Sequence, residues 1–366
     1  MALTITYPEH YQQQLTEKAE LLTQMLSPFN QAALEVFPSP PEYYRMRAEF
    51  RVWHDGDDLY YIMFDSSTQQ RIRVDQFPIA SQLINQLMPA LLDYIRERPT
   101  LRYRLFQVDF LSTTTNQAVV SLLYHRSLEE DWQQEAELLQ EHLSQFVTIY
   151  IVGRARKQKL AVTQDWVIET LNIQGTPYHF QQIENSFTQP NAAVNQQMIQ
   201  WALAATQNAT GDLLELYCGN GNFSLPLAQN FDRVLATEIS KPSVASAQFN
   251  CQLNSIDNVT LVRMSAEDFS AVMQGEKQSR RLPPEVYQSF HCQTVLVDPP
   301  RAGLDEATLE LVSRYPTIVY ISCNPTTLVE NLSELTKTHD VVKAALFDQF
   351  PYTAHMETGV LLQRKQ

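Results

Sequence analysis

The chain has 366 residues, 44% of them hydrophobic and 19% charged, which is the composition of a globular protein long enough for two domains. No apolar run is long enough to span a bilayer, and the N-terminus lacks the basic and apolar regions of a signal peptide, so we expect a cytoplasmic protein. The formal net charge of −14 argues against nonspecific adhesion to nucleic acid, although a local basic face can still bind it.

Up to about residue 180, strands and helices do not alternate regularly. Helices are predicted near residues 8–26, 80–97 and 129–145. Strands are predicted near residues 44–54, 58–64, 70–75, 104–112, 116–125 and 147–152. The two alternating runs around a Thr/Asn turn, between residues 105 and 125, predict a β-hairpin. We therefore predict an α+β domain with antiparallel pairing over residues 1–180.

Basic residues recur in this first half. The alternation in segment 44–64 places Arg47, Arg51 and Trp53 on one side of a strand. Further basic residues follow at Arg71, Arg73, Arg96, Arg98, Arg102, Arg104, Arg154, Arg156, Lys157 and Lys159. They favour either a basic face for RNA or a solvated sheet face balanced by nearby acids, and the residues alone leave both readings open. Phe106 is a candidate stacking residue.

From about residue 186, apolar strands alternate with helices. Strands are predicted in 212–217, 233–239, 259–264, 294–300 and 318–324, and Pro190 opens a helix before them. Continuous apolar runs are typical of a parallel sheet covered on both faces. Two strands after residue 341 are expected as an antiparallel edge, and the polar stretch 275–291 as a loop or insertion. We predict a Rossmann-like α/β domain over residues 181–366.

A glycine turn follows the first strand of this second half. Gly219 and Gly221 bracket the turn, Glu215 precedes it, and the third glycine of a dinucleotide fingerprint is missing. Glu238 ends the next strand, about twenty residues on, where a carboxylate can bind both ribose hydroxyls. An ordinary βα turn is the alternative. The combination resembles the S-adenosylmethionine loop of class I methyltransferases.

Other polar residues stand where predicted strands end or begin. Prolines stop the strand at Asp298, and Cys323 ends the next strand, where open α/β sheets bind ligands. Glu357 and His355 lie close to the start of the last apolar strand. Taken alone, Cys323 would be read as an inert thiol and Glu357 as a solvated carboxylate. The other cysteines, Cys218, Cys251 and Cys292, are interpreted as structural. The wide spacing of all four argues against a zinc site, an iron–sulfur cluster or a disulfide built from them.

Six segments together resemble the uracil-C5 RNA methyltransferase family. They are SFTQPN (186–191), ELYCGNGNFSL (215–225), TEISKPSV (237–244), VDPPRAGL (297–304), YISCNPTTL (320–328) and DQFPYTAHMETGVLL (348–362). These segments span the second half in the family's order. The length and the first half resemble the tRNA branch, which methylates the T-loop uridine at position 54. The rRNA enzymes of the family carry an extra N-terminal barrel and a four-cysteine motif, which this chain lacks.

The resemblance implies S-adenosylmethionine as cofactor and assigns roles to individual residues. Cys323 is expected to add to uracil C6, so that C5 can accept a methyl group, and Glu357 to remove the C5 proton before the thiolate leaves. The residues expected to line the cofactor are Gln189, Tyr217, Asn222, Glu238 and Asp298. Asp298 is also expected near the flipped base, and the further candidate substrate contacts are Arg301, Phe106, Arg47 and Arg51. His355 is left as a structural or substrate-contact residue.

The predicted function is therefore 5-methyluridine formation in the T arm of tRNA, with tmRNA as a further candidate substrate and with no membrane, metal or iron–sulfur partner. Three alternatives stay open: an rRNA uracil-C5 methyltransferase, a noncatalytic RNA-binding or RNA-folding protein, and a flavin/folate enzyme with the same product. Cys323 and Glu357 argue against the noncatalytic protein. The lack of G-x-G-x-x-G after a strand argues against the flavin enzyme.

Overall fold

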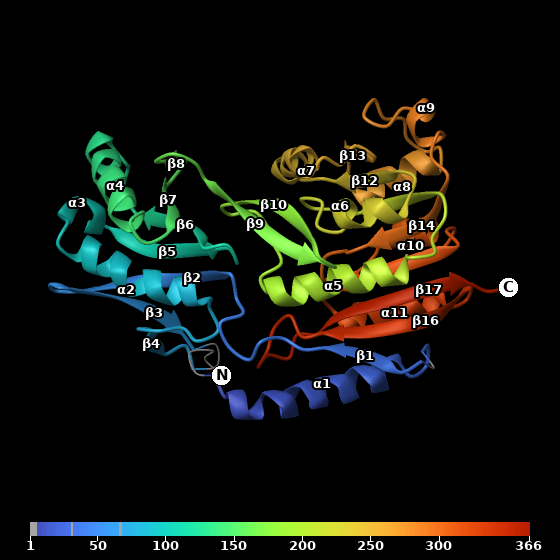
Figure 1. The fold of residues 1–366 in the computed structure, drawn as a ribbon, viewed down its shortest axis with the longest axis horizontal. Coiled ribbons are helices and arrows are strands. Elements are labelled where there is room, and N and C mark those ends of the chain that lie inside the picture. The colour runs from blue at the N-terminus through green and yellow to red at the C-terminus, as the bar shows by residue number, and fades with distance from the viewer. Residues whose placement is uncertain (1–5, 31, 66–67) are drawn as a thin grey trace. The chain divides into compact units, whose positions relative to one another are not determined.

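The computed structural model describes residues 6–30, 32–65 and 68–366, which form two compact units (Figure 1). The first unit is built around Pro40–Thr170 and Gln182–Ala192, and the second comprises His10–Ser39, Leu171–Gln181 and Ala193–Gln366. The chain therefore passes between the units more than once, whereas the sequence suggested one boundary near residue 180. The difference arises because residues 10–39 pack with the C-terminal half.

The first unit is a sheet with helices packed against it. Its described strand order is β4-β3-β2-β5-β6-β7-β8. The strands are β2 (Arg47–Asp55), β3 (Asp58–Phe64), β4 (Arg71–Arg73), β5 (Leu105–Ser112), β6 (Gln117–Tyr124), β7 (Thr148–Ala155) and β8 (Gln158–Ala161). The helices are α2 (Gln82–Arg96), α3 (Pro99–Arg102) and α4 (Glu130–Leu143). Pairing is antiparallel except between β6 and β7, and the predicted hairpin is confirmed as β5–β6.

The second unit contains the sheet that the apolar runs predicted. Its described strand order is β1-β16-β17-β15-β14-β11-β12-β13. The strands are β1 (Leu34–Phe37), β11 (Asp212–Leu216), β12 (Val234–Glu238), β13 (Val259–Arg263), β14 (Cys292–Val297), β15 (Thr317–Ser322), β16 (His339–Phe347) and β17 (Glu357–Arg364). All described neighbours are parallel except that β17 runs antiparallel to both β15 and β16. The predicted Rossmann-like parallel sheet is thus confirmed, and β17 adds two antiparallel pairings to it.

The last two strands do not form the edge of this sheet, contrary to the prediction. In Figure 1 the blue β1 lies beside the red β16, and the two strands pair in parallel from Leu34 to Phe37. Sequence reasoning missed β1 because a strand of four residues that is only half-buried or exposed carries little apolar periodicity.

Helices cover both faces of the second sheet. One face packs against α1 (Tyr11–Leu26), α8 (Ala266–Met273), α10 (Glu306–Val312) and α11 (Pro325–Leu335) in one apolar core. The opposite face meets α5 (Ala192–Ala205), where the Trp201 and Phe347 rings are 5.8 Å apart. A Cβ atom at Gly359 would lie 2.9 Å from both rings, so only glycine fits there. α7 (Lys241–Leu253) packs on β12 and β13.

The remaining elements are short or lie outside the two sheets. β9 (Trp166–Ile173) and β10 (Thr176–Ile183) form a two-stranded ribbon, and α6 (Ser224–Leu227) follows the glycine turn. The polar stretch 275–291 contains the one-turn helix α9 (Pro284–Tyr287), consistent with the predicted insertion. Within the described residues, no helix has the length and apolar character needed to cross a bilayer.

A buried ion pair joins α1 to the C-terminal part of the second unit. The Lys18 ammonium lies 2.7 Å from the Asp348 carboxylate and donates to the Phe350 carbonyl at 2.9 Å. Gln14 donates to the other Asp348 oxygen at 2.9 Å and accepts from the Tyr352 N–H at 3.2 Å. Helix α1, expected in the first domain, thereby holds the start of the 348–356 segment that leads into β17.

Candidate active site

One edge of the second sheet gathers the polar residues predicted at strand ends. Asp298 follows β14 and Cys323 follows β15, and these neighbouring parallel strands finish at the same side. Strand β17 runs the other way, so its first residue, Glu357, reaches this edge. Ser322 of β15 pairs with Thr358 of the antiparallel β17. One residue further along β15 and one residue back along β17, Cys323 therefore lies opposite Glu357. The pairing register therefore brings together three groups that lie far apart in the sequence.

The glycine turn ends β11 on the same edge. Gly219 has a φ of 57° and Gly221 a φ of 88°, a region that side chains rarely adopt. A Cβ atom at Gly221 would also lie 2.3 Å from the Leu225 side chain. The Gly219 N–H donates to one oxygen of Glu238 at 3.0 Å, and the Ser240 N–H donates to the other at 2.7 Å. Glu238 is thus fixed beside the turn, as the sequence predicted.

The groups around this turn fit S-adenosylmethionine. The Glu238 carboxylate offers about four acceptor positions, and the two backbone bonds leave room for two ribose hydroxyls. Glu215 is buried and its Oε1 has no partner among the described residues, while the Ser224 hydroxyl donates to Oε2. The pKa of Glu215 is raised to about 8, mainly by burial; the Ser224 bond opposes the rise, and the charges of Asp298 and Glu238 contribute to it. An underused buried carboxyl suits the cationic end of that cofactor.

The other predicted cofactor residues differ in their surroundings. Tyr217 is half-buried with a φ of 63°, immediately after β11. The amides of Asn222 and Asn195 exchange two hydrogen bonds of 2.8 Å, which ties the turn to α5. Gln189 belongs to the first unit, where the neighbouring Pro190 carbonyl accepts from the Met46 N–H at 2.8 Å. Gln189 stays a prediction.

The thiol and the two carboxyls perturb one another. The pKa of Cys323 is raised to about 11, mainly by burial and also by the negative charges of Glu357 and Asp298, while Arg301 opposes the rise. Burial raises the pKa of Asp298 to about 7. Glu357 is 4% exposed, and burial, followed by the charge of Asp298, holds its pKa well above the usual range. At neutral pH the Cys323 thiol is therefore protonated, and the pKa of Asp298 lies close to the pH.

The loop that follows Asp298 is bound to the start of α11. The Arg301 carbonyl accepts from the Asn324 amide at 3.0 Å and from the Thr327 hydroxyl at 3.1 Å. Asn324 also caps α11 by accepting from the Thr326 N–H at 3.2 Å. Cys323 consequently sits between a buried strand and a capped helix, which holds its backbone in place.

Arg301 and His355 contact each other beside these groups. An Arg301 Nη atom lies 2.8 Å from His355 Nδ1 and 3.1 Å from Nε2. Burial lowers the pKa of His355, and the charges of Arg301 and Lys18 lower it further, so the ring is neutral at neutral pH. Both residues are exposed, which is compatible with substrate contacts and leaves the buried carboxyl of Glu357 as the stronger base.

The first unit carries a separate aromatic and basic cavity of about 620 Å³. Its lining consists of Phe106, Leu123, Tyr124, His125, Arg126, Ser127, Arg154, Ala155 and Arg156. The Phe106 and His125 rings stack at 3.8 Å with an interplanar angle of 11°, and the Arg51 guanidinium lies 5.4 Å from the Phe106 ring. The structure thus brings two of the predicted substrate contacts, Phe106 and Arg51, next to one another.

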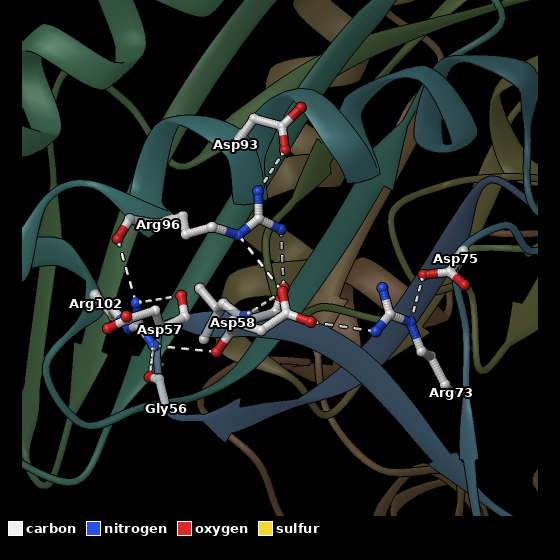
Figure 2. A network of polar contacts seen from close by, with 9 residues as sticks. Gly56, Asp57, Asp58, Arg73, Asp75, Asp93, Arg96 and Arg102 are labelled. Atoms are coloured by element: carbon white, nitrogen blue, oxygen red, sulfur yellow. Dashed lines mark hydrogen bonds and ion pairs between the residues drawn. The ribbon is translucent and has the colours of Figure 1, made fainter.

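Several other basic residues are used within the first unit (Figure 2). Arg102 donates to three carbonyl groups in the β2–β3 turn, and Arg73 and Arg96 approach the Asp58 carboxylate at 3.3 and 3.6 Å. Arg47 is half-buried, burial lowers its pKa, and one of its Nη atoms lacks a partner among the described residues. The balanced-sheet reading therefore holds for Arg73, Arg96 and Arg102, and Arg47 is less accessible than Arg51.

Sequence reasoning missed residues that support the site. Ser224 bonds to Glu215, and Asn195 bonds to Asn222. Nothing in the sequence around Ser224 or Asn195 indicates these contacts. Lys18 did carry one. It interrupts the apolar stripe of α1, whose other buried members are Tyr11, Leu15, Leu22 and Leu26. A lysine on the buried face of a helix indicates a buried partner.

The chain is similar to known proteins over almost its whole length. The model of the family "tRNA (Uracil-5-)-methyltransferase" matches residues 10–365. The chain is 59% identical to a "tRNA/tmRNA (uracil-C(5))-methyltransferase" of Proteus mirabilis, over 97% of this chain and 98% of that protein. It is 57% identical to the Vibrio parahaemolyticus protein of the same name, over the full length of both. A Pyrococcus abyssi tRNA (uracil-54, C5)-methyltransferase, solved with S-adenosyl-L-homocysteine, shares the fold with a TM-score of 0.72 at 20% identity, over 96% of this chain and 83% of that one.

A metal centre is not among the features of the described residues. No group of three or more His, Cys, Asp or Glu side chains there is arranged to hold a metal ion.

We predict that alkylation of Cys323 by iodoacetamide accelerates with pH and does not level off below about pH 10, because only the thiolate reacts and its pKa is raised to about 11. Arg301→Gln should slow the reaction several-fold at about pH 9, since it removes the positive charge that opposes this rise, whereas Arg301→Lys should react like the parent. Mass spectrometry of the Cys323 peptide gives the rate, with Cys323→Ser as the blank. A plateau below about pH 8 would show that the thiol is already activated.

Proposed function

The chain belongs to the tRNA (uracil-5-)-methyltransferase family, and on that basis we propose that it converts the uridine at position 54 of the tRNA T-loop to 5-methyluridine. It is an S-adenosylmethionine-dependent methyltransferase. The proposal extends to tmRNA, because relatives 56–59% identical over nearly the whole chain are named for both RNAs. A cytoplasmic location follows from these substrates.

The observation that carries the proposal is the register that sets Cys323 opposite Glu357, with Asp298 on the neighbouring strand. Uracil C5 needs a nucleophile at C6 before it can accept an electrophile, and Cys323 is the thiol at this edge. Asp298, with a pKa raised to about 7, is the group best able to take the thiol proton at neutral pH. The Cys323 sulfur then forms a bond to C6.

S-Adenosylmethionine, when bound, supplies an electrophilic methyl group; Glu238, Glu215 and the glycine turn would hold it. Glu357 then takes the proton from C5, and the C6–sulfur bond breaks to release the product and the thiolate. A carboxyl whose pKa is held well above its usual range binds that proton more tightly than an exposed one. Glu357 must be ionised when the proton is removed, so ionisation of the Asp298–Glu357 pair is coupled to turnover.

The cavity around Phe106 supports an RNA contact in the first unit. A uridine in a folded T-loop must leave its stack before both faces of its ring become accessible, and aromatic rings and guanidinium groups can stack on the bases left behind. Phe106, His125 and Arg51 form such a group. This local concentration of basic and aromatic groups allows an acidic protein to bind RNA.

Two alternative functions remain distinguishable. An rRNA uracil-C5 methyltransferase would use the same Cys323 and Glu357, so only the substrate separates it. A noncatalytic RNA-binding protein would not need a thiol opposite a buried carboxyl, and this pairing favours an enzyme.

The direct test incubates the full chain with methyl-labelled S-adenosylmethionine and an unmodified tRNA transcript. We expect one labelled nucleotide, 5-methyluridine at position 54, and no label in a transcript with cytidine at that position or with Cys323→Ala. A tmRNA T-arm fragment should also be labelled, and an rRNA fragment should not. Preferential labelling of the rRNA fragment would identify the rRNA alternative, and tight RNA binding without turnover would identify the noncatalytic one.

We predict that Glu357→Gln traps the reaction after methyl transfer. The amide keeps the size of the side chain but cannot take the C5 proton, so base assistance of about 10²–10⁴-fold is lost. A Cys323-linked RNA adduct carrying the methyl label should then survive a denaturing gel. His355→Gln, the matched control, should turn over without trapping. Normal turnover by Glu357→Gln, or an adduct with His355→Gln instead, would show that the base has been misassigned.

We predict that Phe106→Ala weakens tRNA binding by about 5- to 100-fold, because base–aromatic stacking is worth roughly 1–3 kcal/mol. Phe146→Ala is the control, since Phe146 is 75% exposed in the first unit but is not part of the Phe106 cavity. Filter binding at fixed salt measures both affinities, and S-adenosylhomocysteine affinity should not change in either variant. Equal tRNA affinity in Phe106→Ala and the parent would remove the cavity from the RNA interface.

A further inference from the structure

The cofactor turn is tied to the β9–β10 ribbon by one buried side chain. Asn250, on α7, is fully buried. Its Oδ1 accepts from the Gln181 N–H in β10 at 2.7 Å, and its Nδ2 donates to the Asn220 carbonyl in the turn at 3.0 Å. A single amide therefore connects a helix, a strand and the turn.

Two further bonds complete the connection. The Asn220 side chain donates to the Gln181 carbonyl at 3.2 Å, and the Ser246 hydroxyl of α7 donates to the same oxygen at 3.2 Å. The backbone N–H and C=O of Gln181 therefore both have hydrogen-bond partners. Asn220 is linked to β10 in two ways: its carbonyl is bridged to the strand by Asn250, and its side chain bonds to the strand directly.

The turn needs such an external tether because of its sequence. Asn220 lies between Gly219 and Gly221, which both have positive φ values. Glycine restricts the backbone less than any other residue, so the turn depends on bonds to its peptide groups. The Gly219 N–H is held by Glu238 and the Gly221 N–H by the Cys218 carbonyl, and the bond from Asn250 holds the Asn220 carbonyl from outside the turn. Fixing that peptide before a ligand arrives removes an ordering cost from binding.

Asn254, the C-cap residue that follows α7, separates this effect from simple packing of the ribbon. It accepts from the His179 N–H at 2.8 Å and donates to the His179 carbonyl at 2.7 Å, so it holds β10 against α7 just as Asn250 does. Its side chain bonds to His179 of β10 and to the Asn250 carbonyl of α7, and Asn250 is the member of the pair that also binds the turn.

We infer that Asn250 is a positioning residue for cofactor binding: it holds the Gly219–Gly221 turn in its ligand-binding conformation by bridging it to β10. The inference rests on the proposed function, because the turn is taken to bind S-adenosylmethionine. By linkage, a ligand on the turn must in return stabilise the docking of β10 on α7.

Calorimetry with S-adenosylhomocysteine on the full chain tests this inference. Asn250→Ala should raise the Kd about tenfold or more, because the turn loses a buried hydrogen bond and its preorganisation. Asn254→Ala, which breaks a comparable pair of bonds to β10, should bind like the parent while losing a similar amount of thermal stability. Hydrogen exchange should show that the ligand protects the Gln181 amide in the parent and in Asn254→Ala but not in Asn250→Ala.

Asn250→Asp, assayed at about pH 8, keeps the acceptor for Gln181 and removes the donor to Asn220, so it tests the same point with less damage to the fold. It too should raise the Kd. Equal Kd values for the parent, Asn250→Asp and Asn254→Ala would overturn the inference and leave the proposed function intact. A parent chain that does not bind S-adenosylhomocysteine at all would contradict the proposed function, and the inference would fall with it.

Discussion

The antiparallel insertion of β17 between β15 and β16 is the constraint on which the candidate active site depends. A purely parallel sheet would bring only the ends of its strands to the ligand-binding edge. Because β17 runs in the opposite direction, its first residue arrives there, and the Ser322–Thr358 pair sets the register that places Glu357 opposite Cys323. A shift of one residue would turn Glu357 to the other face of the sheet.

This geometry also explains the electrostatics of the site. Burial leaves little water to solvate a charge on Asp298 or Glu357, and the charge of Asp298 adds to the effect on Glu357, so both carboxyls hold their protons to higher pH than exposed ones. The same two groups raise the pKa of the Cys323 thiol. In the proposed mechanism, the acid–base differences between these groups supply both a proton acceptor for the thiol and a base for C5.

The segment that carries Glu357 is held from outside the sheet. The Lys18–Asp348 ion pair fixes its beginning, one residue beyond the Phe347–Glu357 pair, and the Arg301–His355 contact lies near its end. Removing one member of a buried ion pair leaves the other uncompensated, so α1 is part of the framework of the second unit. Because residues 10–39 pack with the C-terminal half, Lys18 can hold the segment that leads to Glu357.

Local patterns in the sequence determined much of this protein. The apolar runs predicted the parallel sheet, the glycine pair predicted a tight turn, and the prolines after Asp298 and the polar residues after β15 marked strand ends, because each of these signals acts within a few residues of chain. The resemblance to a family then assigned roles to the site residues, including Cys323, Glu357, Gln189, Tyr217 and Asn222, and all of these roles remain proposals. Only the tertiary structure decided that β1 closes the edge of the sheet, that Lys18 meets Asp348, that Arg102 is used by the β2–β3 turn, and that Asn250 joins the glycine turn to β10. These outcomes depend on pairing between residues tens to hundreds of positions apart, and sequence periodicity reports which face of an element is buried but not which partner it meets there.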